Sequence, residues 1–309
     1  MIGRLREKFA AGLGAAALAL GALAAPAAAG APPVQPAPAE TRAAPRPAMW
    51  LLQDRDTKIY LFGTTHILPP DFHWRSEAVN RVIREAAELV METADDEAAA
   101  DEDFLQSMYM GKSVPILWRV SPEYRPRLQE IIAASGMPPD FFDELHTWAA
   151  GFMLMAIQMQ ALYGEGEMPP LVGVEDVLTD EFRRAGKPIS AVETSGQQMA
   201  MFRDMPRRTQ QAFLESFLAD GPGEETGMTG DEAWVSGRID FLEREAAMMP
   251  RDLYELLLIR RNRAWTDWLA RRMERPGTVM FAVGALHLTG PDSVQAMLAA
   301  RGLQARRIE

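Results

Sequence analysis

Apolar runs typical of strands lie near both ends of the chain, and helical patterns fill the region between them. Residues 49–63 (MWLLQDRDTKIYLFG) place two apolar runs around the polar turn DRDT, which predicts a β-hairpin. Four more short runs favour strands, at residues 88–93 (ELVMET), 188–193 (PISAVE), 278–284 (TVMFAVG) and 303–309 (LQARRIE).

The helical patterns set the fold class. Residues 77–86 carry apolar positions at helical spacing between the hairpin and the next strand, which is the order of an α/β unit. Residues 104–170 and 196–273 look largely helical. We therefore predict an α/β fold, with α+β as the alternative. It has a central mixed sheet built from N- and C-terminal strands and a large helical insertion over those two ranges.

The N-terminus has the organisation of an export signal. Arg4, Arg6 and Lys8 precede an apolar Ala/Gly-rich stretch that ends in three alanines before Gly30. This pattern predicts a signal peptide over residues 1–29, with an uncleaved membrane anchor as the alternative. Residues 30–48 are rich in Pro and Ala and predict a disordered linker, so the domain would cover residues 49–309. We expect a periplasmic or secreted protein with no stable membrane span after cleavage.

Charge and composition exclude several functions. The net charge of −11 argues against a nucleic-acid partner, which requires a basic face. The chain has no cysteine, which excludes disulfides, thiolate metal sites and cysteine nucleophiles. It also lacks a G-x-S-x-G nucleophile elbow and a phosphate-binding glycine loop.

Two of the four histidines follow a strand end at the same spacing. His66 comes three residues after Gly63 in YLFGTTH, and His287 comes three residues after Gly284 in FAVGALH. Each glycine would let the chain turn sharply at the strand end. Both histidines would then lie where open α/β sheets bind ligands. The alternative for each is an imidazole that only ties down its loop.

Glu92 is a third candidate because it ends the strand ELVMET. It reaches the same sheet edge if its strand lies beside the first one. Two imidazoles and a carboxylate form a common ligand set for a divalent metal, which suits hydrolysis. The alternative is a carboxylate that caps a helix or a loop. No compact H-E-x-x-H metal-binding motif is present.

Other polar residues support this candidate site. Glu175 and Glu193 lie at a turn and a strand end and could act as general base or further ligand, although Glu193 could instead cap the next helix. Arg261 lies in a helix whose basic residues are expected to face solvent, but an inward arginine would bind a substrate carboxylate or orient a glutamate. His73 and His146 lack the strand–glycine context and are interpreted as surface or capping residues.

Taken together, these segments resemble the TraB/GumN family. The resemblance rests on YLFGTTH, LVMET, VGVED with GKPISAVETSGQQ, LLIRRNRAWTDWL and FAVGALHLTGPDSVQAMLAARG, and it runs from about Met49 to Ile308. That family is related to the Tiki metalloproteases and, more distantly, to ChaN-like haem-binding and erythromycin-esterase-like proteins. One departure is Leu286, where many members have glycine before the histidine.

The resemblance implies a metal-dependent hydrolase, in particular a peptidase, that uses Mn²⁺ or Co²⁺ rather than a structural zinc. It implies that His66, Glu92 and His287 are the essential residues. Supporting family positions are Glu193, Gln197, Arg261 and Asn262.

Our first hypothesis is therefore an exported metallohydrolase that acts on a peptide or protein substrate. His66, Glu92 and His287 would hold the metal, Glu193 or a bound hydroxide would supply the base, and Arg261 would position the substrate or an oxyanion. The alternatives are a haem- or metal-binding protein without turnover and a module that sequesters a peptide. The full set of three ligands argues against the last.

Overall fold

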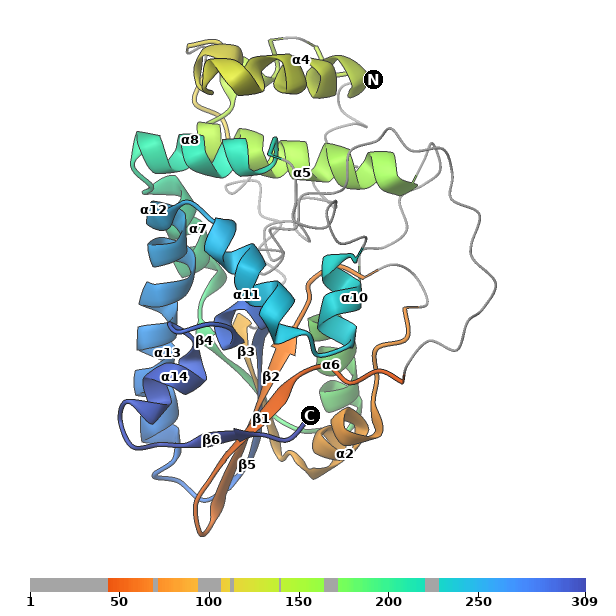
Figure 1. Ribbon diagram of the computed structural model, residues 1–309, viewed down its shortest axis with the longest axis vertical. Helices are drawn as coiled ribbons and strands as arrows, with labels where there is room; N and C mark the ends of the chain where they lie inside the picture. The colour runs from red at the N-terminus through yellow and green to blue at the C-terminus, as the bar shows by residue number, and fades with distance from the viewer. Residues whose placement is uncertain are drawn as a thin grey trace. The chain divides into compact units, whose positions relative to one another are not determined.

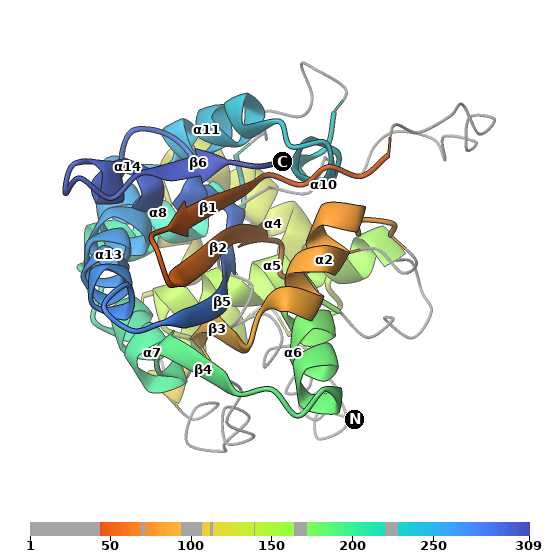
Figure 2. The ribbon, with the colours of Figure 1, turned by 90° about the horizontal axis from the view of Figure 1, so that it is seen from below.

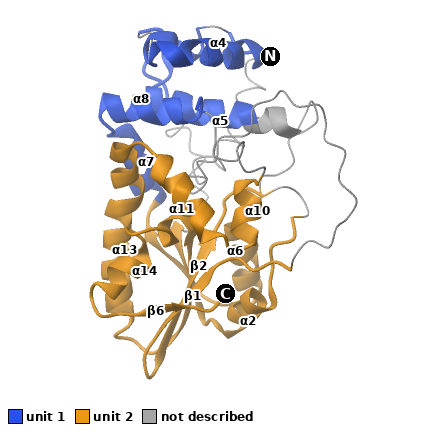
Figure 3. Cartoon of the chain, viewed as in Figure 1, with its two compact units in different colours: residues 1–29, 95–171, 195–221 blue, residues 30–94, 172–194, 222–309 orange. Residues whose placement is uncertain are grey.

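The computed structural model describes residues 44–68, 72–93, 107–111, 114–138, 140–163, 172–219 and 228–309. The predicted signal peptide and nearly all of the predicted linker lie outside these ranges. The described residues fall into two compact units (Figure 3). The helical unit lies within residues 95–171 and 195–221, and the sheet unit lies within residues 30–94, 172–194 and 222–309.

The sheet unit is built on a six-stranded mixed sheet in the order β4-β3-β5-β2-β1-β6, which confirms the predicted fold class. β2, β5, β3 and β4 run parallel, whereas β1 pairs antiparallel with β2, and the edge strand β6 pairs antiparallel with β1. The strands are β1 (Met49–Gln53), β2 (Thr57–Thr64), β3 (Glu88–Thr93), β4 (Ile189–Glu193), β5 (Gly277–Gly284) and β6 (Ala305–Arg307).

Alternate residues of each inner strand pack into different cores. In β2, Tyr60 and Phe62 belong to one apolar cluster, whereas Ile59 and Leu61 belong to the other. The same alternation holds in β3, where Leu89 and Met91 separate from Val90. A strand with two buried faces reads as a continuous apolar run, which is why these strands were visible in the sequence.

Helices cover both faces of the sheet (Figures 1 and 2). The cluster with Tyr60 and Phe62 includes side chains of α2, α6, α10 and α11, and the cluster with Ile59 and Leu61 includes those of α13 and α14. The helical elements are α2 (Glu77–Glu85), α6 (Val174–Arg184), α10 (Gly230–Val235), α11 (Ile239–Met248), α12 (Arg251–Tyr254), the π-helical turn η5 (Glu255–Ile259), α13 (Arg260–Arg272), η6 (Ala285–Leu288) and α14 (Val294–Ala299).

The helical unit has its own aromatic core. The ring centroids of Phe152, Phe202 and Phe213 lie 5.0 to 5.3 Å from one another. Within the described ranges, no helix is long and apolar enough to cross a membrane. The helices of this unit are η2 (Ile116–Trp118), η3 (Pro122–Tyr124), α4 (Arg125–Ala134), η4 (Phe142–Glu144), α5 (Thr147–Tyr163), α7 (Ser195–Arg203) and α8 (Arg207–Ser216).

The range 196–273, the second part of the predicted helical insertion, is divided between the two units. Its first helices, α7 and α8, belong to the helical unit. The later helices, α10 to α13, belong to the sheet unit. The apolar faces of α10, α11 and α13 bury themselves against the strands, so these helices are part of the α/β layers.

Candidate functional site

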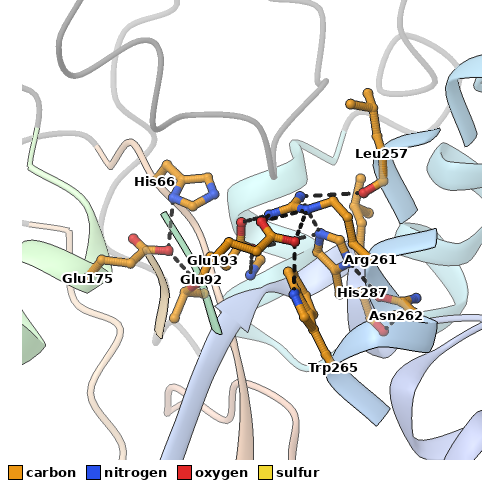
Figure 4. Close-up of polar contacts among 12 residues, drawn as sticks. His66, Glu92, Glu175, Glu193, Leu257, Arg261, Asn262, Trp265 and His287 are labelled. Carbon is orange, nitrogen blue, oxygen red and sulfur yellow. Dashed lines mark hydrogen bonds and ion pairs between the residues drawn. The ribbon is translucent and has the colours of Figure 1, made fainter. Parts of the chain in front are cut away.

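The carboxyl ends of the four parallel strands meet at one edge of the sheet. The register pairs Thr64 of β2 with Gly284 of β5, and Thr93 of β3 with Glu193 of β4. This edge gathers the strand-end residues that the sequence singled out (Figure 4). β3 does not lie beside β2, because β5 is inserted between them. Glu92 therefore neighbours the strand that carries His287.

His66 is fixed through one ring nitrogen. Its Nδ1 atom lies 2.9 Å from Oε1 of Glu175, near the N-terminus of α6, and the Thr64 hydroxyl donates to the same oxygen. The other nitrogen of His66, Nε2, is buried and has no hydrogen-bond partner. The same holds for Oε2 of Glu175. A buried polar atom without a partner is rare and indicates a ligand position or a reactive group.

Gly173 allows this arrangement. A Cβ atom at residue 173 would lie 2.5 Å from the carbonyl oxygen of His66 and 2.8 Å from Oε2 of Glu175. The loop after β2 and the start of α6 are also joined by a hydrogen bond from Val174 N to Thr65 O, at 3.0 Å. Only glycine fits between the two segments, so Gly173 is a site residue that the sequence reasoning missed.

His287, like His66, is held through its Nδ1 atom. The side chain is completely buried, and Nδ1 lies 2.6 Å from Oδ1 of Asn262. Because that oxygen is an acceptor, Nδ1 carries the ring proton and Nε2 carries the lone pair. Nε2 accepts from Nη1 of Arg261 at 3.1 Å, and the ring of Trp265 lies 4.3 Å away.

Arg261 lies inside the site rather than on the solvent face of its helix. It is 4% exposed and comes two residues after the π-helical turn η5, a distortion that is frequent at functional sites. Its Nη2 atom donates to Oε2 of Glu92 at 2.5 Å and to Oε2 of Glu193 at 2.9 Å. Its Nε atom lies 3.1 Å from both oxygens of Glu193.

Glu92 is a buried carboxylate that remains ionised. Burial is the largest influence and would raise its pKa, but the charge of Arg261, together with the two histidines and the Gly284 N–H, outweighs burial, so the pKa lies well below its ordinary value. The backbone N–H of Gly284 donates to Oε1 of Glu92 at 2.7 Å, which also favours the charged form. Gly284 thus serves the site through its backbone.

The two histidines have opposite pKa shifts. Burial, followed by the charge of Arg261, lowers the pKa of His287 to about 3, so its imidazole is neutral. Burial is also the largest influence on His66 and would lower its pKa, but the charge and hydrogen bond of Glu175, together with the charge of Glu92, raise the pKa above the ordinary value of 6.5. Titratable groups whose pKa values are pushed apart in this way are typical of sites that move protons or bind cations.

Glu193 and Trp265 complete the site. The indole N–H of Trp265 donates to Oε1 of Glu193 at 2.9 Å, and the guanidinium of Arg261 lies over its ring at 4.6 Å. Glu193 therefore holds the arginine. Trp265 was missed in the sequence, although it lies one helical turn after Arg261.

The glycines act differently from the prediction. We expected Gly63 and Gly284 to supply turns open only to glycine, but neither has a positive φ angle. Gly63 is needed for close packing, since a Cβ there would lie 3.0 Å from Cα of Ala285.

Three further residues were considered in the sequence, one as a family position and two as surface or capping histidines. Gln197 lies on α7, which belongs to the helical unit. His73 is exposed, and the ring of His146 stacks on Trp148.

The donor chemistry fits a divalent metal. Each histidine has Nδ1 against an acceptor, which is the usual arrangement when Nε2 binds a metal, and Nε2 of His66 is buried without a partner. The imidazole and carboxylate donors do not converge at metal-coordination distance. In the part of the chain that the structure describes, no three His, Asp or Glu side chains are grouped closely enough to hold an ion. Arg261 contacts both Glu92 and His287.

Comparison with known proteins identifies the family. The model of the TraB/PrgY/gumN family matches residues 48–307, which includes the whole sheet and every residue of this site. The chain belongs to the TraB/PrgY/gumN family. Two relatives are the uncharacterised YbaP proteins. That of Escherichia coli K12 is 25% identical over 82% of this chain and 92% of its own length. That of Shigella flexneri is 26% identical over 77% of this chain and 87% of its own.

No solved structure matches the chain. The motifs by which the sequence resembles the family, including both G-x-x-H segments, lie within the matched range.

Proposed function

We propose that the protein is a metal-dependent hydrolase that cleaves amide bonds in peptides or proteins. His66, Glu92 and His287 would hold the ion, through Nε2 of each imidazole and a carboxylate oxygen. The observation that carries the proposal is the matched engagement of the two imidazoles. Glu175 and Asn262 each bind an Nδ1 atom and so leave Nε2 as the donor.

A divalent ion at this position would polarise the scissile carbonyl and lower the pKa of a water molecule. Imidazole and carboxylate donors suit several first-row metals, and the family resemblance favours Mn²⁺ or Co²⁺. Glu193 already accepts hydrogen bonds from Arg261 and Trp265, so we assign it an orienting role instead of proton transfer. Arg261, held in this way, would bind the developing oxyanion or a substrate carboxylate.

Export to the periplasm or the medium is part of the proposal, on the strength of residues 1–29 alone. The test of that part is the N-terminal sequence of the protein recovered from the producing cells. A mature N-terminus near Gly30 is expected, and an intact Met1 terminus in the cytoplasmic fraction would contradict export.

The function is tested by metal content and by cleavage of a peptide library with added Mn²⁺ or Co²⁺. His66→Ala and His287→Ala should each lose metal and cleavage, whereas His73→Ala, which alters an exposed histidine, should match the parent. If the first two variants bind metal and cleave as well as the parent, the proposal is wrong. A Soret band on haem addition that both variants lose would support the binding-protein alternative.

A further inference from the structure

One side chain makes contact with two of the three proposed metal ligands. Nη2 of Arg261 lies 2.5 Å from Oε2 of Glu92, and Nη1 lies 3.1 Å from Nε2 of His287. The other oxygen of Glu92 accepts from the backbone of Gly284. Two of the proposed donor atoms, Oε2 of Glu92 and Nε2 of His287, are therefore atoms that Arg261 contacts.

The same guanidinium has further anchors, and its Nη2 atom is shared between Glu92 and Glu193. Nε and Nη2 of Arg261 pair with both oxygens of Glu193, and its planar group lies over Trp265. These anchors do not involve Glu92 or His287. The arginine can therefore leave the two proposed ligands and stay bound to Glu193.

A divalent ion and the Arg261 guanidinium would repel each other at the same carboxylate oxygen of Glu92. They carry charges of the same sign, and Oε2 of Glu92 is buried in a region where such repulsion is poorly screened. The lone pair on Nε2 of His287 likewise serves either the guanidinium or the ion. Occupation by one therefore requires departure of the other.

We propose that Arg261 is a built-in competitor for the metal position, which pairs with Glu92 and His287 until an ion displaces it from them and leaves it bound to Glu193 alone. The inference rests on the proposed function and goes beyond it, because it makes Arg261 a determinant of metal affinity. It also couples ion binding to the release of the guanidinium towards substrate.

The direction in which metal affinity changes when Arg261 is replaced distinguishes a competitor from a supporting side chain. A side chain that merely supports metal ligands weakens metal binding by about 10- to 100-fold when it is removed. Removal of a competing positive charge has the opposite effect, of about ten-fold or more for a nearby like charge. Arg261→Gln should therefore bind Co²⁺ about ten-fold more tightly than the parent, and Arg261→Lys, which keeps the charge, should bind it less tightly than Arg261→Gln.

The measurement is Co²⁺ affinity by visible absorption and calorimetry on the purified protein. The matched control is Arg272→Gln, because Arg272 is also buried on α13 and pairs with Glu88 at 3.3 Å, at the other end of β3. Its Co²⁺ affinity should equal that of the parent. If the parent binds Co²⁺ and Arg261→Gln binds it equally or more weakly, the inference is wrong while the proposed function stands.

If no protein in the series binds Co²⁺, the proposed function itself fails, and the inference fails with it. A crystal structure of the parent with Mn²⁺ tests the inference even if Arg261→Gln does not fold. Nη2 of Arg261 should then be beyond hydrogen-bond distance of Glu92 and still paired with Glu193. An ion bound while the Arg261–Glu92 contact persists would overturn the inference.

Discussion

Arg261 and Glu92 form a buried ion pair with Nη2 and Oε2 2.5 Å apart, and a second such pair lies along the same helix and strand. Arg272 pairs with Glu88 at 3.3 Å. Glu88 and Glu92 point to the same side of β3 because they are four residues apart. The two pairs fix α13 along the strand at both ends. The pair at the carboxyl edge is the one that meets the two histidines.

Asn262 should be important for metal binding although it contacts His287 at Nδ1 and not at the proposed donor atom Nε2. Asn262→Leu removes the acceptor for Nδ1 of His287 and the bond to Asp292 O, so it leaves buried polar groups unpaired. We expect a loss of about 1–3 kcal/mol in the free energy of unfolding. Metal affinity should fall by about 10- to 100-fold. Urea denaturation and Co²⁺ titration measure the two effects.

Asn262→Asp keeps an acceptor and should recover most of the metal affinity. The control is Arg263→Ala, the neighbouring exposed position on α13. It should change neither quantity. If Asn262→Leu leaves the affinity unchanged, the ring of His287 does not depend on Asn262 for its orientation.

The positions of the strands could be predicted from the sequence because the strands are buried on both faces. The order of the strands in the sheet could not be predicted. Tyr60–Phe62 and Met280–Ala282 are continuous apolar runs, which depend only on burial. That β5 pairs with β2 and β3, from opposite ends of the chain, depends on long-range packing that no local pattern records. The gathering of His66 and His287 at one edge was predictable, since parallel strands end together.

The sequence predicted the inward orientation of the Arg261 side chain only in part. Its neighbours Arg260 and Arg263 are exposed, as basic residues on a helix usually are. Arg261 itself shares a helical stripe with the buried Trp265 and Leu269, at spacings of four. That spacing was the available signal. No sequence pattern indicated the contact between Gly173 and the carbonyl of His66, because this contact joins segments that are distant in the sequence.

Gly173→Ala should disturb His66 without changing any polar group. The added Cβ would lie 2.5 Å from the His66 carbonyl oxygen, so the loop or the start of α6 must move. Overpacking of this kind costs about 1–3 kcal/mol of stability, which thermal unfolding would show. Metal affinity should fall as well. Val172→Ala, a change at an exposed neighbour, should leave both unchanged, and equal affinity in the two variants would contradict the role given to Gly173.

Trp265→Phe separates a hydrogen bond from ring packing. The phenylalanine ring can still cover His287, but the donor to Oε1 of Glu193 is lost. A hydrogen bond to a charged acceptor contributes about 1.5–3 kcal/mol, and urea denaturation should show a loss in that range. Trp268→Phe is the matched control, because Trp268 stacks on Phe281 from the same helix. A loss as large in the control would mean that ring volume, and not the bond to Glu193, decides the stability.

The half-buried Asp231 on α10 and the buried Glu245 on α11 predict that stability falls as the pH rises. Burial, followed by the charge of Asp231, raises the pKa of Glu245 from 4.5 to about 7. Burial, followed by the charge of Glu232, raises the pKa of Asp231 to about 6. Folding therefore favours the protonated acids. The contribution of Asp231 is complete below its ordinary pKa of 3.8 and is lost as the pH rises through about 6, and that of Glu245 is complete below 4.5 and is lost as the pH rises through about 7.

Glu245→Gln replaces the acid by a neutral amide and should remove most of this dependence. We expect the variant to gain on the order of 2 kcal/mol over the parent at pH 8, and the gain to shrink towards pH 5, where the parent acid is protonated. Chemical denaturation at several pH values measures this difference. Glu243→Gln, at an exposed position of the same helix, should run parallel to the parent. A Glu245→Gln curve that is also parallel to the parent would show that Glu245 is charged in the folded protein at neutral pH.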